Sequence, residues 1–146
     1  MKILVSADWH LKLGQKSVQK DWAINRYKML FSQIHALENK VDLHVIAGDI
    51  MDRLLNMEEL ALYFDFVVGC TIETIILPGN HESDKRNTTF LTQLKDVTNS
   101  LNPLVRIVDD YFSNDVYDII PYRKLKEFKP EAFYNKILFT HCRGDI

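Results

Sequence analysis

Short apolar runs alternate with amphipathic stretches along the first part of this chain. Residues 2–7 and 43–47 are compact apolar runs with β-branched side chains, and each ends in polar residues, which predicts buried strands. Residues 21–39 carry apolar side chains at the spacing of one helical face. A strand, helix, strand order predicts right-handed crossovers and a sheet whose first strands are parallel.

The pattern continues with shorter elements toward the other end. Asn56 followed three residues later by Glu59 resembles a capping box, which predicts a helix over residues 56–68. We expect a third strand at 71–77 and a third helix at 89–101, where apolar residues again share one face. Further short strands are expected at 104–108, 116–120 and 137–140.

Composition is that of a folded globular domain. The 146 residues are 47% hydrophobic and 26% charged, the usual balance of a globular protein. No run approaches the ~20 apolar residues that span a bilayer, so a membrane partner is not expected. Cys70 and Cys142 lie far apart, which argues against a disulfide framework and favours a reducing, cytoplasmic setting. The polar residues 109–115 are expected to form a turn within one domain, residues 1–146.

The net charge of −2 gives no sign of a broad basic face. Proteins that grip DNA through its phosphates usually carry such a face, so tight DNA binding by this chain alone is not favoured. Phosphate chemistry is not excluded, because bound metal ions can supply positive charge.

Some titratable residues have ordinary structural explanations. His35 lies within a predicted helix and His44 lies inside a predicted strand, so both are expected to be structural. The short basic run that contains Arg123, Lys124 and Lys126 is expected to be a solvated face.

Polar clusters follow directly after four of the predicted strands. Their members are Asp8 with His10, Gly48 with Asp49, Gly79 with Asn80 and His81, and finally His141. Because the carboxyl ends of parallel strands meet at one edge of a sheet, we expect the first three clusters to converge, and the fourth can join them. Oxygen ligands mixed with imidazoles suit Mn, Fe or Zn better than Ca. The sequence therefore predicts a metal site at this edge.

The spacing within the clusters has a physical sense. Asp8 and His10 are two residues apart, so in extended backbone their side chains point the same way. Gly48 permits a sharp turn that would leave Asp49 projecting, and its two oxygens could bridge two metals. Each cluster alone is more often a turn or a satisfied polar side chain, but their combination favours a functional site.

In these residues the chain resembles the calcineurin-like metallophosphoesterase superfamily. The family's motifs are Asp-x-His, Gly-Asp-x-x-Asp, Gly-Asn-His-Asp/Glu, a lone His and Gly-His-x-His, and the first four occur here in order between Asp8 and His141. The start Ser-Ala-Asp-Trp-His-Leu at residues 6–11 resembles the SbcD-type DNA repair nucleases and their phage counterparts. Leu11 after His10 and Leu54 after Arg53 favour the same branch, because related phosphatases usually carry Gly at both positions.

The resemblance implies a fold and a role for each motif residue. The fold would be the N-terminal part of a four-layer αββα sandwich. Asp49 would bridge two divalent metal ions, with Mn²⁺ expected. His81 would act near the leaving group as a proton donor or transition-state stabiliser, and Asp52 and Arg53 would orient ligands or contact phosphate. The implied metal ligands are Asp8, His10, Asp49, Asn80 and His141.

The Gly-His-x-His motif does not occur in these 146 residues, so each metal would lack one imidazole. We therefore expect a fragment of a longer nuclease that is weakly active by itself. The implied whole hydrolyses phosphodiester bonds in DNA, as the nuclease subunit of an SbcCD-like repair and recombination complex. Its partners would be DNA, an SbcC-like ATPase and a second nuclease copy, in the cytoplasm of the cell or of a phage host. The alternatives are a phosphatase of phosphoproteins or small phosphoesters, and a non-catalytic interaction module.

Overall fold

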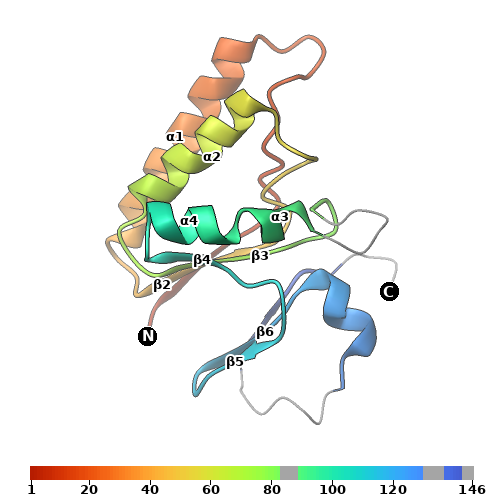
Figure 1. The fold of residues 1–146 in the computed structure, drawn as a ribbon. Coiled ribbons are helices and arrows are strands. Elements are labelled where there is room, and N and C mark those ends of the chain that lie inside the picture. Colours follow the sequence, from red (N-terminus) through yellow and green to blue (C-terminus); the bar gives the residue numbers. More distant parts are fainter. Residues whose placement is uncertain (83–88, 130–136, 143–146) are drawn as a thin grey trace.

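Two β-sheets lie face to face in this protein, and helices cover the outer face of the first (Figure 1). The structure is a computed structural model that describes residues 1–82, 89–129 and 137–142. The first sheet is parallel, in the order β1-β2-β3-β4. Its strands are β1 (Ile3–Ser6), β2 (Leu43–Ala47), β3 (Thr74–Leu77) and β4 (Val105–Ile107). The predicted α/β class and the parallel start are confirmed.

The second sheet is shorter and mixed, in the order β5-β6-β7. Strand β5 pairs antiparallel with β6, and β6 pairs parallel with β7. These strands are β5 (Phe112–Ser113), β6 (Tyr117–Ile120) and β7 (Ile137–Thr140). The apolar inner faces of the two sheets form a common core that includes Val45, Ile75 and Ile119, all fully buried.

Helices α1 (Lys20–Glu38) and α2 (Met57–Gly69) lie side by side over the first sheet (Figure 1). Phe31 of α1 and Phe66 of α2 meet Trp9 in the core beneath them, with ring centroids 5.8 and 4.8 Å from the Trp9 ring. With a helix layer on one face and the second sheet on the other, every residue of β3 is buried, as parallel strands require. None of the described helices has the length and apolar character needed to cross a membrane.

The predicted capping box at the start of α2 is confirmed. The Asn56 side chain accepts a hydrogen bond from the Glu59 N–H (2.9 Å), and the Glu59 carboxylate accepts one from the Asn56 N–H (3.1 Å). Two backbone donors that the helix cannot satisfy itself are thereby paired.

Three local features differ from the sequence prediction. The helix expected at 89–101 breaks at Leu94 into α3 (Phe90–Gln93) and α4 (Lys95–Leu101). The stretch 109–115 contains β5, which was expected to be only a turn. The basic run lies on a 3₁₀ helix, Tyr122–Glu127, whose residues are not buried. Such short elements depend on tertiary pairing rather than on periodicity, which explains why the pattern missed them.

Replacing the cap residue should weaken α2 without changing the fold. We expect Asn56→Ala to lower the free energy of unfolding by about 1 kcal/mol, because the Glu59 N–H loses its acceptor. Urea titration followed by circular dichroism measures the change. Asn25→Ala is the matched control, because Asn25 is exposed in the middle of α1 and alanine favours helix there. Equal losses in both variants would contradict a capping role for Asn56.

Candidate metal centre

The segments after β1 and β2 run side by side and place the first two motifs together. The N–H of Asp8 donates to the Gly48 carbonyl (3.1 Å), and the N–H of His10 donates to the Asp49 carbonyl (3.0 Å). Asp8, His10 and Asp49 have left-handed backbone with φ of 56°, 47° and 50°. The expectation of an extended backbone from Asp8 to His10 is therefore wrong.

Left-handed backbone costs a residue with a Cβ ~1–3 kcal/mol, and Asp and His adopt it more readily than most residue types. In this protein it follows from the pairing of the two loops just described. The curled backbone keeps His10 Nε2 near the Asp8 carboxylate, at 3.7 Å. The side chains of the first motif still converge, by a different geometry from the predicted one.

One group of ligand-type atoms is formed by Asp8, Asp49 and His141, all within 4.8 Å of one another. His141 Nδ1 lies 2.9 Å from the Ala47 carbonyl, which can only accept, so Nδ1 carries the proton and Nε2 is a lone pair. That Nε2 faces Asn80 Oδ1 at 2.9 Å and Asp49 Oδ2 at 3.4 Å. Three acceptor atoms directed at one point fit a bound cation.

Gly48 is required for this arrangement. Its φ is +93°, and a Cβ there would lie 2.5 Å from His141 Nδ1. The absence of a side chain lets β7 bring His141 against the loop that carries Asp49, which sequence spacing alone could not show.

A second group consists of His10, Asp49 and His81, again within 4.8 Å of one another. His81 Nδ1 lies 3.0 Å from the Asp52 carbonyl, which fixes its proton there and leaves Nε2 facing Asp49 Oδ2 at 3.8 Å. His10 Nδ1 is buried and makes no hydrogen bond to the described residues. An imidazole nitrogen left in this state beside a carboxylate also fits a divalent cation.

Asp49 belongs to both groups, as the predicted bridging role requires. Its Oδ1 accepts a hydrogen bond from the His81 N–H (2.9 Å), while Oδ2 faces His81 on one side and His141 on the other. The structure thus brings all five predicted ligands together. It also brings His81 close to Asp49. The predicted role of His81 beside the leaving group stays a prediction.

Asp52 lies between His10 and His81. Its Oδ1 is 3.5 Å from His10 Nδ1 and 3.5 Å from His81 Nδ1, while Lys12 Nζ lies 2.9 Å from Oδ2. The hydrogen bond from Lys12 lowers the pKa of Asp52, so its carboxylate stays ionised. Asp52 thus lies close to both imidazoles, and its predicted role in orienting ligands stays a prediction.

Arg53 is directed toward helix α2 instead. Its two terminal nitrogens lie 2.8 and 2.9 Å from the carboxylate oxygens of Glu59, a bidentate pair. Glu59 also accepts from the Leu13 N–H (3.0 Å), so this contact ties the site loops to the start of α2. In this arrangement the guanidinium of Arg53 is bound by Glu59. A contact between Arg53 and phosphate stays a prediction.

Glu82 is a site residue for which the sequence motifs predicted no role. It is fully buried, and its two carboxylate oxygens accept hydrogen bonds from the N–H groups of Asp49 (3.1 Å), Met51 (2.9 Å) and Gly79 (2.8 Å). Burial raises the pKa of Glu82 to about 7, against the opposing effect of these donors. One side chain thus clamps the loops after β2 and β3 against each other. The sequence signal that could have identified Glu82 is its position in the Gly-Asn-His-Glu motif.

His35 and His44, which were expected to be structural, lie outside this centre. His44 is buried in β2 and, like His35, bonds to the buried Glu38 through Nδ1, at 3.3 and 3.0 Å. Cys70 lies near the same carboxylate. Because hydrogen bonds already satisfy Glu38, we interpret this cluster as structural, in line with the prediction.

Comparison with known proteins identifies the class. The chain matches the calcineurin-like phosphoesterase family over residues 1–143, and it belongs to this family. It is also similar to a protein of Escherichia phage T5, the probable exonuclease subunit 1, with 32% identity over 150 aligned residues. The alignment covers the whole of this chain but 46% of the relative's length. The family uses divalent metals, and the two groups that share Asp49 provide suitable ligands.

Metal titration tests the assignment of the two groups. We expect Asp49→Asn to weaken binding of both Mn²⁺ ions by at least about tenfold, because the charged ligand common to both groups is lost. His141→Ala should weaken only one of them. Isothermal titration calorimetry measures both sites, and Asp65→Asn, an exposed change on α2, is the matched control. Unchanged binding in Asp49→Asn would show that the metals lie elsewhere.

Removing the Glu82 clamp should loosen the site from behind. We expect Glu82→Ala to lower the free energy of unfolding by about 3 kcal/mol or more, since several buried N–H groups lose their acceptor. Glu82→Gln should recover only part of this loss, because an amide offers one oxygen instead of two. Urea unfolding of the metal-free protein provides the measurement. Wild-type stability in Glu82→Ala would mean that the loops do not depend on this carboxylate.

Proposed function

We propose that this chain carries the metal-binding half of a nuclease that hydrolyses phosphodiester bonds in DNA. The observation that carries the proposal is the pair of ligand groups joined by Asp49, with Asp8 and His10 reaching them from β1. Similarity to a protein named as an exonuclease subunit supports DNA as the substrate class. The departures at Leu11 and Leu54 from the phosphatase pattern support the same choice.

Different residues of the chain would bind the metal ions and transfer protons. Asp49 would hold two divalent ions, for which we propose Mn²⁺, while Asn80 and His141, whose Oδ1 and Nε2 lie 2.9 Å apart, would complete one group. The ions supply a hydroxide at neutral pH and neutralise charge on the phosphate. His81, whose Nδ1 lies 3.0 Å from the Asp52 carbonyl, would exchange a proton with the departing oxygen through Nε2.

The chain spans under half the length of its T5 relative, so its cellular setting belongs to the proposal. The relative is named as a subunit, which supports an assembly with further chains. We infer an ATPase of the SbcC type and a second nuclease copy as partners, in DNA repair and recombination in the host cytoplasm. The family's final Gly-His-x-His histidines would then come from outside these 146 residues.

DNA-end cleavage measured against turnover of a small ester tests the proposed substrate. We expect slow release of nucleotides from labelled duplex ends with Mn²⁺, little hydrolysis of p-nitrophenyl phosphate, and loss of cleavage on chelation. His81→Asn should lower the cleavage rate by ~10²–10⁴-fold, the usual contribution of a general acid. Asp65→Asn should cleave like the wild type. Hydrolysis of the small ester with DNA untouched would favour a phosphatase and end the nuclease proposal.

A further inference from the structure

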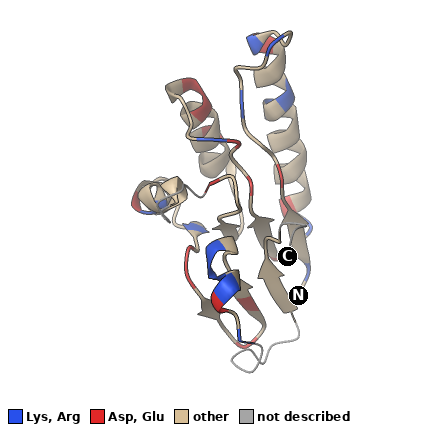
Figure 2. Cartoon of the chain, turned by 90° about the vertical axis from the view of Figure 1, so that its right-hand side faces the viewer, with Lys and Arg blue, Asp and Glu red and all other residues tan. Residues whose placement is uncertain are grey.

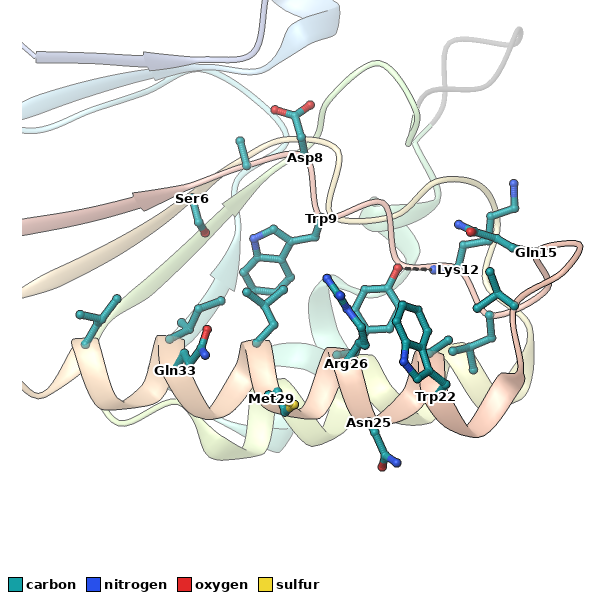
Figure 3. Close-up of a pocket in the computed structure, with 18 of the residues that line it drawn as sticks. Ser6, Asp8, Trp9, Lys12, Gln15, Trp22, Asn25, Arg26, Met29 and Gln33 are labelled. Carbon is teal, nitrogen blue, oxygen red and sulfur yellow. Dashed lines mark hydrogen bonds between the residues drawn. The ribbon is translucent and has the colours of Figure 1, made fainter.

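The hydroxyl of Tyr27 on helix α1 contacts the segment that leaves the metal centre after His10. It donates to the His10 carbonyl at 2.9 Å, and the Lys12 N–H donates to it at 3.1 Å, the bond drawn as a dashed line at Lys12 in Figure 3. A carbonyl can only accept and an amide N–H can only donate, so the two bonds fix the direction of the hydroxyl. One side chain of α1 thus holds the backbone on both sides of Leu11.

The loop after β2 holds the same segment by other groups. The His10 N–H donates to the Asp49 carbonyl at 3.0 Å, and the Leu11 N–H donates to the Ile50 carbonyl at 2.9 Å. Those bonds use the N–H groups of the two residues, whereas Tyr27 binds the His10 carbonyl. The position of His10 therefore depends on α1 as well as on the loop that carries Asp49.

His10 has a backbone that its surroundings must maintain. Its φ of 47° is left-handed, and such backbone persists only where neighbouring groups impose it. The ψ angle of His10 sets the direction of the His10 carbonyl, so the hydrogen bond from Tyr27 restrains this ψ directly. A helix that supplies no metal ligand thereby acts on the conformation of one that does.

The imidazole of His10 depends on this backbone for its direction. A metal-binding imidazole is usually oriented by a hydrogen bond at its other ring nitrogen. His10 Nδ1 is buried and makes no such bond to the described residues. The ring nevertheless belongs to the group formed with Asp49 and His81. The main chain of His10, held by Tyr27, must therefore contribute much of the orientation.

The segment also carries the cation that pairs with Asp52. Lys12 Nζ lies 2.9 Å from Asp52 Oδ2, and Asp52 Oδ1 lies 3.5 Å from Nδ1 of both His10 and His81. Lys and Arg do not gather into one continuous patch in the view of Figure 2, so we ascribe the hold on Asp52 to this local contact. Because Tyr27 binds the Lys12 N–H, it also fixes where the Lys12 side chain begins.

We propose that Tyr27 is a positioning residue of the metal centre, whose hydroxyl holds His10 in the group formed with Asp49 and His81 and so strengthens cation binding there. The inference rests on the metal-binding role proposed above for these ligands. Within the described residues, Tyr27 makes no hydrogen bond to the group that contains His141. One of the two ions should therefore depend on the hydroxyl more than the other.

A purely structural role for Tyr27 makes a different prediction. Its ring packs against the core beneath α1 and lies 6.3 Å from the Phe31 ring. A phenylalanine would fill the same space, so packing alone does not require the hydroxyl. The variant Tyr27→Phe therefore separates positioning of His10 from packing of α1.

Isothermal titration with Mn²⁺ is the first test. We expect Tyr27→Phe to bind one ion about tenfold more weakly and the other as the wild type does, since groups behind metal ligands contribute roughly 10–100-fold to affinity. Tyr63→Phe is the matched control, because it removes a buried hydroxyl that lies 2.7 Å from Thr98 Oγ1, between α2 and α4. It should bind both ions like the wild type.

Hydrogen exchange of the Lys12 amide tests the same link without relying on a variant. Coupling between two binding events is reciprocal, so an ion that is strengthened by the Tyr27 contact must also strengthen that contact. We expect Mn²⁺ to slow exchange of this amide about tenfold in the wild type, the same factor as in the titration. The slowing should be lost in Tyr27→Phe. If that variant does not fold, the wild-type measurement decides.

Three results would overturn the proposal. The first is wild-type affinity for both ions in Tyr27→Phe, and the second is a Lys12 amide that exchanges equally fast with and without Mn²⁺. The third is an equal loss of affinity in Tyr63→Phe, which would assign the effect to general stability. No DNA is present in these measurements, so their failure is distinguishable from failure of the proposed nuclease activity.

Discussion

The position of the Asp49 carboxylate is the constraint on which the rest of the centre depends. One oxygen is held by the His81 N–H, and the other faces imidazoles on two sides. Its backbone N–H is held by the buried Glu82, which also binds the neighbouring loop. The same turn needs Gly48, because β7 brings His141 into contact with it. A small error in this loop would separate both ligand groups at once.

The strongly periodic parts of the fold could be predicted from the sequence. The parallel strands, the two long helices and the Asn56 cap follow from local apolar pattern and cap chemistry, and all are present. The break at Leu94 and the short strand β5 could not be predicted, because the break interrupts an otherwise helical pattern and a strand of two residues is too short to show a period. Periodicity reports which face of an element is buried, but not where a neighbour interrupts it.

The candidate site could also be predicted only in part, for the same physical reason. The convergence of Asp8 and Asp49 was predictable, since they follow neighbouring parallel strands of one sheet. His141 follows β7 of the second sheet, so its position depends on how the two sheets pack. The left-handed backbone could not be predicted, because it results from pairing between the loops after β1 and β2. The ion pair between Arg53 and Glu59 could not be predicted either, because a motif position does not specify the direction of a long side chain. Residue types thus indicated the chemistry, while loop packing determined the geometry.

Electron paramagnetic resonance of the Mn²⁺-loaded protein tests the central claim most directly. If Asp49 joins the two ligand groups, the two ions lie ~3.5–4 Å apart and their spins are coupled. The account therefore predicts the exchange-coupled spectrum of a manganese pair when two equivalents are bound. Two independent Mn²⁺ signals, or a single bound ion at saturation, would contradict a shared Asp49.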